Sequence, residues 1–231
     1  MSRTSVFARE QLRAPFTLAL LVAIPALFVI SAAGVLSDFA TALGGSLAGD
    51  AAVALSAGWA AAFISGALGF FQAASSRGAD RRLVLAGLGP ARVASSRIAA
   101  SVLLAFVAAG TAFVALILRV GVAHPLHAAV AVLAFALLYL AVGVLLGSVI
   151  SAPLEGSLLV IFVFLLDAFS GPGMSGSPPP WSVSQKAADV LIAAGSGVGS
   201  PTGDWIKLAL VTITALVAAF CVFVAAARSR A

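Results

Sequence analysis

Residues 75–97 read SSRGADRRLVLAGLGPARVASSR and form the longest polar interruption in a chain that is otherwise almost continuously apolar. Five of the thirteen Lys and Arg residues fall within this stretch, namely Arg77, Arg81, Arg82, Arg92 and Arg97. The apolar run on each side is long enough to cross a bilayer, which takes about 20 residues. The pattern therefore predicts a basic connection between two membrane-spanning helices, the second and third of the chain.

The composition places the whole chain in a membrane. Of its 231 residues, 62% are hydrophobic and 9% are charged, whereas a soluble domain carries about 25% charged residues. The net charge of +5 does not indicate a nucleic-acid-binding face, because the basic residues stand in short blocks beside apolar runs. No polar stretch exceeds about 35 residues, which is too short for a separate soluble core. Residues 1–231 are therefore predicted to form a single transmembrane domain.

Six segments qualify as spanning helices, so the predicted fold is an all-α membrane protein with six transmembrane helices. They cover residues 15–36, 51–71, 98–118, 127–150, 156–169 and 205–227. The fifth segment is short and carries Asp167 near its end. Gly143 and Gly147 in the fourth segment have the spacing that permits close contact between membrane helices. Ser65 and Gly69 in the second segment are spaced alike.

The distribution of Lys and Arg beside these segments sets the orientation. If the N-terminus is cytoplasmic, ten basic residues lie on the cytoplasmic side and three on the outer side. The cytoplasmic set comprises Arg3, Arg9, Arg13, the five arginines of the polar interruption, Arg228 and Arg230, and the outer set comprises Arg119, Lys186 and Lys207. Both termini are therefore predicted to be cytoplasmic, with the chain in the plasma membrane. A cleaved secretory signal ending near residues 31–33 is the competing interpretation, but the apolar run continues to Leu36 and is long enough to span.

Residues 1–14 combine apolar and charged residues at spacings near a helical period. The apolar residues Val6, Phe7, Leu12 and Phe16 alternate with the charged residues Arg3, Arg9, Glu10 and Arg13. An amphipathic helix on the cytoplasmic membrane surface, leading into the first span, explains this pattern. A merely basic flank is the alternative, and both interpretations stay open.

The polar interruption contains helix start and stop signals. Asp80 is a suitable N-cap for a short helix that continues through Ala86, and Gly87 and Gly89 can end it. Pro90 suits the first position of the next helix, which continues into the third span. A short helix followed by a glycine–proline corner is rigid enough to transmit a displacement. The alternative is that the arginines only fix the topology of the chain.

Two acidic residues belong to the fifth span. Glu155 would begin that helix, where the helix dipole favours a negative charge, so it is either a structural cap or a contact for a partner. Asp167 lies about 18 Å further along, at about 1.5 Å for each of twelve residues. An ionised carboxylate facing lipid is costly, so Asp167 should face the bundle interior, where it either lines a translocation path or marks the outer end of a short helix. The outer connection, residues 170–204, contains an amphipathic piece at residues 187–194 and is expected to hold a short helix or helix pair that dips against the outer membrane face.

Motifs for catalysis are scarce. The sequence contains no G-x-x-x-x-G-K-[ST] phosphate-binding loop, so the chain cannot bind ATP in that manner. Residues 173–176 (GMSG) match the pattern around the nucleophile of rhomboid-like intramembrane proteases, but that chemistry needs a later histidine, and His124 and His127 come earlier. The two histidines alone cannot complete a metal shell. We therefore expect no catalytic residues, no cofactor and no metal.

The order of these features resembles the type-2 ABC-transporter permease family. The shared features are the basic start, a first span with an internal proline (Pro25), the segment SSRGADRRLVLAGLGPARVASSRIAA between the second and third spans, the opening PLEGSLL of the fifth span, and an SG-containing, proline-rich stretch before the sixth. The resemblance covers essentially the whole chain and lies in layout more than in single residues. Ser75, Ser76 and Arg77 stand where acids are common in the family, and a Gly-Pro pair at residues 89–90 replaces Thr-Pro.

The resemblance implies a membrane subunit that works beside a second one, identical or paralogous, within membrane lipid. Two separate ATPase subunits would bind under the cytoplasmic loops, and no nucleic acid is expected as a partner. The expected contact residues are Arg77, Asp80, Arg81, Arg82, Leu85, Pro90, Arg92 and Glu155. Closure of the ATPase subunits would push the helix between the second and third spans and the N-terminal surface helix. The mostly apolar helices suggest export of a hydrophobic or amphipathic small molecule or lipid. The alternative from another class is a motor-independent membrane protein, either a channel or an assembly or scaffold subunit.

Overall fold

The computed structural model describes residues 15–47, 49–150, 152–171, 174, 182–196 and 202–228. Every regular element within these residues is an α-helix. The amphipathic helix expected over residues 1–14 lies outside the described residues, as does most of the motif at residues 173–176.

Six helices are long and apolar enough to cross a membrane, as predicted. They are α2 (Pro15–Ala42), α3 (Gly49–Ser75), α5 (Pro90–Arg119), α6 (Pro125–Val149), α7 (Pro153–Ser170) and α9 (Thr202–Arg228). Two short helices accompany them in the described chain, namely α4 (Arg77–Leu85) between α3 and α5, and α8 (Gln185–Ser196) between α7 and α9. The all-α prediction is confirmed for these residues, the short helix expected around residues 187–194 is present as α8, and the six apolar helices fit a multi-pass membrane protein.

The helices extend beyond several of the predicted spans. α2 continues to Ala42 instead of ending at Leu36, and α3 continues to Ser75 instead of ending at Phe71. Apolar content identifies the part of a helix that fits the bilayer core, whereas the helix itself continues until a breaker interrupts it. After α2 the breaker is the glycine pair at residues 44–45, and Gly44 adopts a positive φ of 77°.

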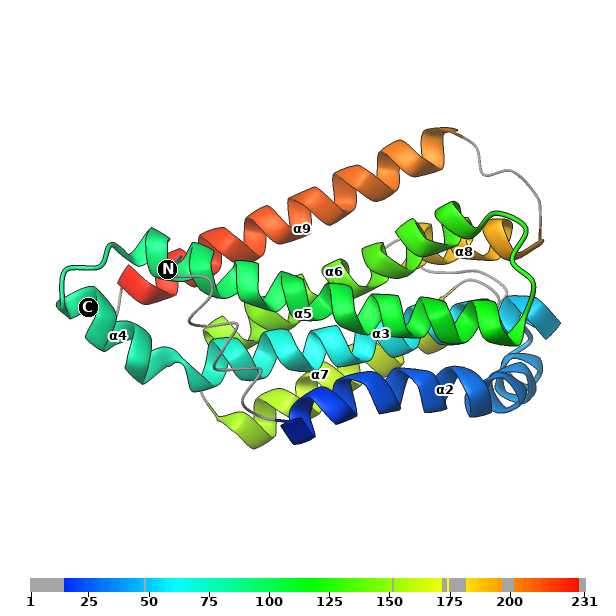
Figure 1. Cartoon of the computed structure of the whole chain (residues 1–231), viewed down its shortest axis with the longest axis horizontal. Helices are drawn as coiled ribbons and strands as arrows, with labels where there is room; N and C mark the ends of the chain where they lie inside the picture. The colour runs from blue at the N-terminus through cyan, green and yellow to red at the C-terminus, as the bar shows by residue number, and fades with distance from the viewer. Residues whose placement is uncertain are drawn as a thin grey trace.

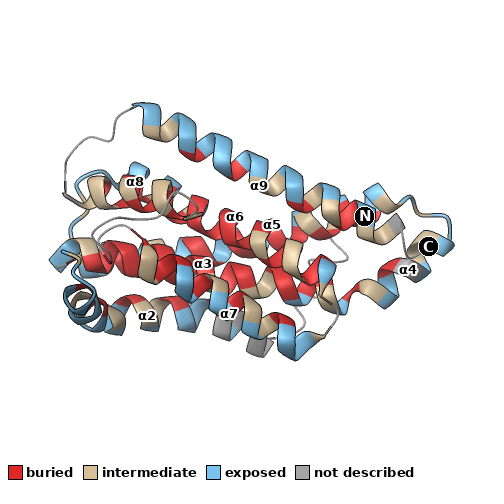
Figure 2. Cartoon of the chain, turned by 180° about the vertical axis from the view of Figure 1, so that it is seen from behind, coloured by how far each residue is buried: buried red, intermediate tan, exposed pale blue. Residues whose placement is uncertain are grey.

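Successive long helices run in opposite directions along the bundle (Figure 1). The start of α2, the end of α9 and the whole of α4 therefore lie at one end, named here the α4 end, and α8 lies at the opposite end. α4 projects at its end of the bundle and contacts α3, α5 and α9. The C-terminal part of α2 turns away from the bundle direction and is viewed nearly end-on (Figures 1 and 2). The polar interruption thus lies at the same end as the two ends of the described chain.

α3 forms the centre of the bundle and packs against α2, α5, α6, α7 and α8. Buried residues are concentrated in α3 and α6 (Figure 2). Trp59 and Phe70 of α3 and Phe135 and Tyr139 of α6 are among the largest fully buried side chains. α2, α7 and α9 instead expose large apolar side chains, as expected of helices that contact lipid or another membrane helix.

Glycines allow α3 and α6 to approach closely. A Cβ atom at Gly143 would lie 2.0 Å from the carbonyl oxygen of Gly66, and one at Gly147 would lie 2.5 Å from that of Phe70. A Cβ atom at Gly69 would meet a backbone oxygen of α6 at 2.5 Å. The close helix contact predicted from the glycine spacing is confirmed, because a side chain at any of these positions would force the two helices apart.

Candidate functional site at the α4 end

α4 is a nine-residue helix that a glycine motif closes. Leu88 N donates to Leu83 O at 3.1 Å and Gly87 N donates to Val84 O at 3.0 Å, and Gly87 has a positive φ of 88°. This is the Schellman arrangement, in which a glycine in the left-handed conformation ends a helix. Pro90 then opens α5. The predicted helix stop at Gly87 and helix start at Pro90 are both confirmed.

The beginning of α4 differs from the prediction. α4 begins at Arg77, so Asp80 lies within its first turn instead of capping it. The carboxylate of Asp80 accepts a hydrogen bond from Ser76 Oγ at 2.8 Å and pairs with Arg97 Nε of α5 at 2.5 Å. The assignment of Asp80 as N-cap is therefore wrong, because a buried cation on the next helix draws its side chain inward.

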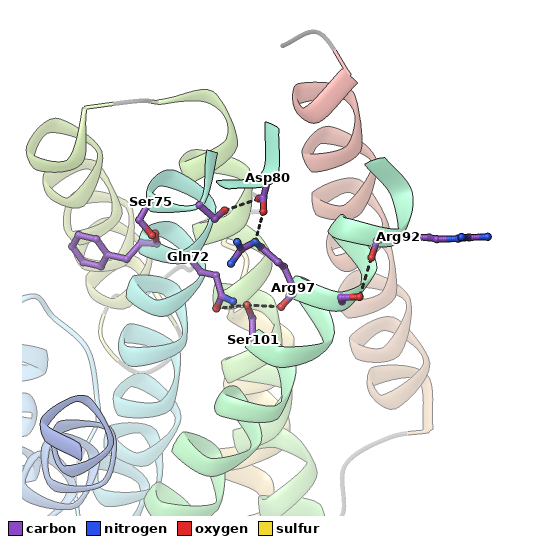
Figure 3. A network of polar contacts seen from close by, with 9 residues as sticks. Gln72, Ser75, Asp80, Arg92, Arg97 and Ser101 are labelled. Carbon is purple, nitrogen blue, oxygen red and sulfur yellow. Dashed lines mark hydrogen bonds and ion pairs between the residues drawn. The ribbon is translucent and has the colours of Figure 1, made fainter. Parts of the chain in front are cut away.

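Asp80 and Arg97 form a buried ion pair between α4 and α5 (Figure 3). Asp80 is 5% exposed and Arg97 is 9% exposed. One turn further along α5, the hydroxyl of Ser101 donates to Gln72 Oε1 of α3 at 2.7 Å, and both of these side chains are buried. Gln72, Ser76, Asp80, Arg97 and Ser101 are named here the buried polar cluster, and they join α3, α4 and α5.

Arg77 ties α4 to a further helix. Its guanidinium donates to the backbone carbonyl oxygens of Gly147 and Ile150 at the end of α6. The last carbonyl groups of a helix have no partner within the helix, so a cation placed there satisfies them and suits the negative end of the helix dipole. The side chain of Arg77 is therefore used within the chain, as is that of Asp80.

Four of the predicted contact residues are exposed at the α4 end, namely Arg82, Leu85, Arg92 and Glu155. Arg92 points away from the buried polar cluster in Figure 3, and Leu85 is 65% exposed. Pro90 is half-buried, and the side chain of Arg81 lies outside what the structure describes. The exposed four are the predicted residues that a partner can reach directly.

A cavity of about 30 Å³ lies beside the cluster, between α3, α4, α6 and α9. Its polar lining comes from Arg77, Asp80 and Ser148. This volume suits about one water molecule rather than a nucleotide or a cargo molecule. Among the described residues, no group of three or more His, Cys, Asp and Glu is placed to hold a metal ion. What the α4 end offers is a firmly held short helix with two exposed arginines, Arg82 on α4 and Arg92 in the first turn of α5.

Asp167 forms a second buried polar site, at the opposite end from α4. It is 2% exposed and accepts hydrogen bonds from Tyr139 Oη at 2.5 Å, Val183 N at 3.0 Å and Ser184 N at 3.2 Å. Val183 and Ser184 directly precede α8, so the carboxylate fixes the entry of α8 to α6 and α7. The prediction that Asp167 faces the interior is confirmed. Its role in a translocation path stays a prediction, and its three bonds favour an anchoring role.

Lys186 connects α8 to α9 near the same end. Its Nζ lies 2.9 Å from Asp189 Oδ2 and 3.5 Å from Asp204 Oδ1 of α9. The hydrogen bond to Asp189 raises the pKa of Lys186 above its ordinary value. α8 is thus held to α6 and α7 through Asp167 and to α9 through Lys186.

The pairing within the buried polar cluster was not predicted from the sequence. Gln72, Ser76 and Asp80 are spaced four residues apart, as are Arg97 and Ser101. Residues four apart share one face of a helix. The sequence therefore indicates two polar stripes on consecutive helical segments, and this is the signal from which the pairing could have been suspected. The sequence does not reveal the angle between α4 and α5 that brings these stripes together.

Comparison of the chain with protein-family models, with curated proteins and with solved structures gave no match.

Proposed function

We propose that this chain is the membrane-spanning permease subunit of an ATP-driven ABC transporter, energised by separate ATPase subunits that bind at the α4 end. Three features support the proposal. The sequence layout resembles that of type-2 ABC permeases, six helices are long and apolar enough to span a membrane, and a short helix stands between the second and third of them. The proposed cargo is a hydrophobic or amphipathic small molecule or lipid, exported across the plasma membrane.

The observation that carries the proposal is the double character of α4. Arg82 and Leu85 are exposed on it, while Asp80 and Arg77 attach it to α5 and α6 from inside. A docking element for a motor needs both properties, because an exposed surface is required for binding and a firm attachment is required to transmit force.

The exposed surface indicates the chemistry of the partner. Arg82 and Arg92 would meet acidic groups of the ATPase subunit, and Leu85 would fill an apolar depression between them. Exposed charges of this kind act more on the association rate and on specificity than on affinity. ATP hydrolysis is assigned to the partner, since the sequence of this chain has no phosphate-binding loop.

In this proposal, α4 and both termini are cytoplasmic, and a second permease subunit, identical or paralogous, stands beside the first. Exposed apolar side chains on α2, α7 and α9, among them Leu27, Phe162 and Leu210, are compatible with contact to lipid or to another membrane helix. The translocation path would lie between the two subunits.

Affinity purification of the tagged chain from its native membranes tests the proposal. We expect a P-loop ATPase to co-purify, recognised by mass spectrometry and by ATP hydrolysis of the purified complex. The double variant Arg82→Glu/Arg92→Glu should lower its recovery about tenfold, because two attractive contacts become repulsive. Lys207→Glu reverses an exposed cation at the opposite end and serves as the matched control with unchanged recovery.

Recovery of the wild-type chain without any ATPase would reject the transporter and favour the motor-independent channel or scaffold. Equal recovery of the ATPase with the double variant would reject docking on α4. It would be consistent with an ATPase that docks on another surface of the chain.

A further inference from the structure

We infer that Arg77 and the Asp80–Arg97 pair form a link that carries a displacement of α4 into α5 and α6. The inference rests on the proposed function, because the displacement comes from a bound ATPase. These three are positioning residues, since they act on helices and contact neither nucleotide nor cargo. The link has two arms, one from Asp80 to α5 and one from Arg77 to α6.

The sequence predicts a rigid corner between α4 and α5, but the chain connection there is by itself a poor transmitter. It consists of residues 86–89, AGLG, in which Gly87 adopts a positive φ of 88°. Glycine permits many backbone conformations, so a push on α4 would change the dihedral angles of this turn before it moved α5. Stiff coupling therefore needs a side-chain connection that bypasses the turn.

Asp80 and Arg97 provide that connection to α5. Arg97 lies seven residues after Pro90, which is about two turns inside the helix, so the pair holds the body of α5 rather than its first turn. Both side chains are buried, with Nε 2.5 Å from Oδ1. Separating a buried ion pair is strongly unfavourable because each charge loses its main partner in a poorly solvated setting, so the contact resists extension. The hydrogen bond between Ser101 and Gln72 extends the connection to α3.

Arg77 provides the second arm, to α6. Its planar guanidinium donates to two carbonyl oxygens at the end of that helix, and a planar donor set holds both in a fixed relation. Further along the bundle, α5 and α6 together line an open apolar groove of about 250 Å³ that includes Phe106, Gly110 and Leu133. A displacement of α4 that moves α5 relative to α6 therefore changes the shape of this groove.

Hydrogen–deuterium exchange of the chain in lipid nanodiscs tests the two arms separately. Asp80→Asn removes the charge at constant size and should raise exchange about tenfold around Arg97, in the second and third turns of α5. Arg77→Gln removes the second arm and should raise exchange at residues 146–150, the end of α6. Asp50→Asn changes an exposed acid at the opposite end of α3 and should match the wild type.

Exchange unchanged from the wild type in either arm would overturn the link. If Asp80→Asn does not fold, Ser76→Ala removes one hydrogen bond to the same carboxylate and should shift exchange in the same direction.

Transmission is measured in the complex with the ATPase, in a Cys221→Ser background. Spin labels at Leu118 of α5 and Leu166 of α7, both exposed, report the distance between a linked helix and one outside the link. A non-hydrolysable ATP analogue should shift this distance in the wild type. The shift should be lost in Asp80→Asn although the ATPase still binds, and retained in Arg97→Lys, which keeps the charge.

A full distance shift in Asp80→Asn would overturn the link and leave the proposed function intact. A wild-type chain that recovers no ATPase would reject the proposed function instead, and the exchange measurements alone would then decide whether the two arms hold α5 and α6.

Discussion

At the scale of single residues, the ion pair of Asp80 and Arg97 affects stability mostly through the buried charge that is left when one partner is removed. Removing one member of a buried pair costs about 3–5 kcal/mol, because the other stays behind as an uncompensated charge. Replacing both members by apolar residues of similar volume is often neutral or stabilising. The contribution of this pair to stability can therefore be separated from its contribution to transmission.

Asp80→Ala should lower the free energy of unfolding by about 3–5 kcal/mol, and Asp80→Leu/Arg97→Met should recover most of the loss. Thermal unfolding in detergent, followed by tryptophan fluorescence, measures both effects. Asp38→Ala changes an exposed acid on α2 and should stay within about 0.5 kcal/mol of the wild type. A double variant that is no more stable than Asp80→Ala would contradict an electrostatic origin of the cost.

Asp167→Ala should loosen α8. Tyr139 Oη and the N–H groups of Val183 and Ser184 lose their acceptor, and each buried donor left unsatisfied costs about 1–3 kcal/mol. Hydrogen–deuterium exchange over Gln185–Ser196 should accelerate while the α4 end stays unchanged. Tyr139→Phe removes one of the three donors and should have a smaller effect. Identical exchange in the wild type and Asp167→Ala would exclude the anchoring role.

The sequence predicts some of these residue roles and not others. An acid within an apolar span must face the interior, so the placement of Asp167 follows from its solvation cost alone. Its partners Val183 and Ser184 do not follow, because they belong to a connection whose path depends on how α7 and α8 pack. Asp80 and Arg97 are separated in the same way by the turn at Gly87, and their pairing requires the geometry of that turn.

At the scale of elements, the contact between α3 and α6 depends on glycine at facing positions. Gly143→Ala would place a Cβ 2.0 Å from the carbonyl oxygen of Gly66. It should lower the free energy of unfolding by about 1–3 kcal/mol, the usual cost of overpacking. Gly110→Ala is the matched control in α5, where no atom lies within 4 Å of the added Cβ. It should be neutral or stabilise by up to about 1 kcal/mol, since alanine is the better helix former.

Thermal unfolding of the two glycine variants side by side gives the measurement. If Gly143→Ala had the same melting temperature as Gly110→Ala, the separation between α3 and α6 would have to be larger than the structure shows.

The helical elements themselves are the most predictable part of the fold. Six apolar segments were recognised because each helix must satisfy its own backbone groups in lipid and cover them with apolar side chains. α4 was recognised from its stop at Gly87 and the start of α5 at Pro90. The sequence places its N-cap at Asp80, four positions after the observed N-cap Ser76, because Asp80 is a good N-cap in isolation and only its tertiary partner Arg97 shows that the side chain is used elsewhere.

At the scale of the whole molecule, the alternating helix directions place α4 beside the end of α9. The proposed orientation puts this end in the cytoplasm. In a Cys221→Ser background, Gly78→Cys on the exposed side of α4 should react with a membrane-impermeant maleimide only after the membrane is opened. Thr202→Cys at the opposite end should react in intact cells. The reverse labelling pattern would invert the orientation and remove α4 from the reach of a cytoplasmic ATPase.

The central position of α3 has a consequence for biogenesis. α3 has the lowest mean hydropathy of the six apolar helices, 1.7 against 2.8 for α6, yet it leaves the ribosome before the α5 and α6 helices that later enclose it. A translocon releases segments into lipid according to their apolarity. Of the six spans, α3 should therefore insert least efficiently on its own. Membrane insertases and quality-control proteases would therefore act on this chain after α3, the second span, is synthesised and before α6, the fourth span, can pack against it. Slower translation between these two helices would leave more partly inserted chains, which are then degraded.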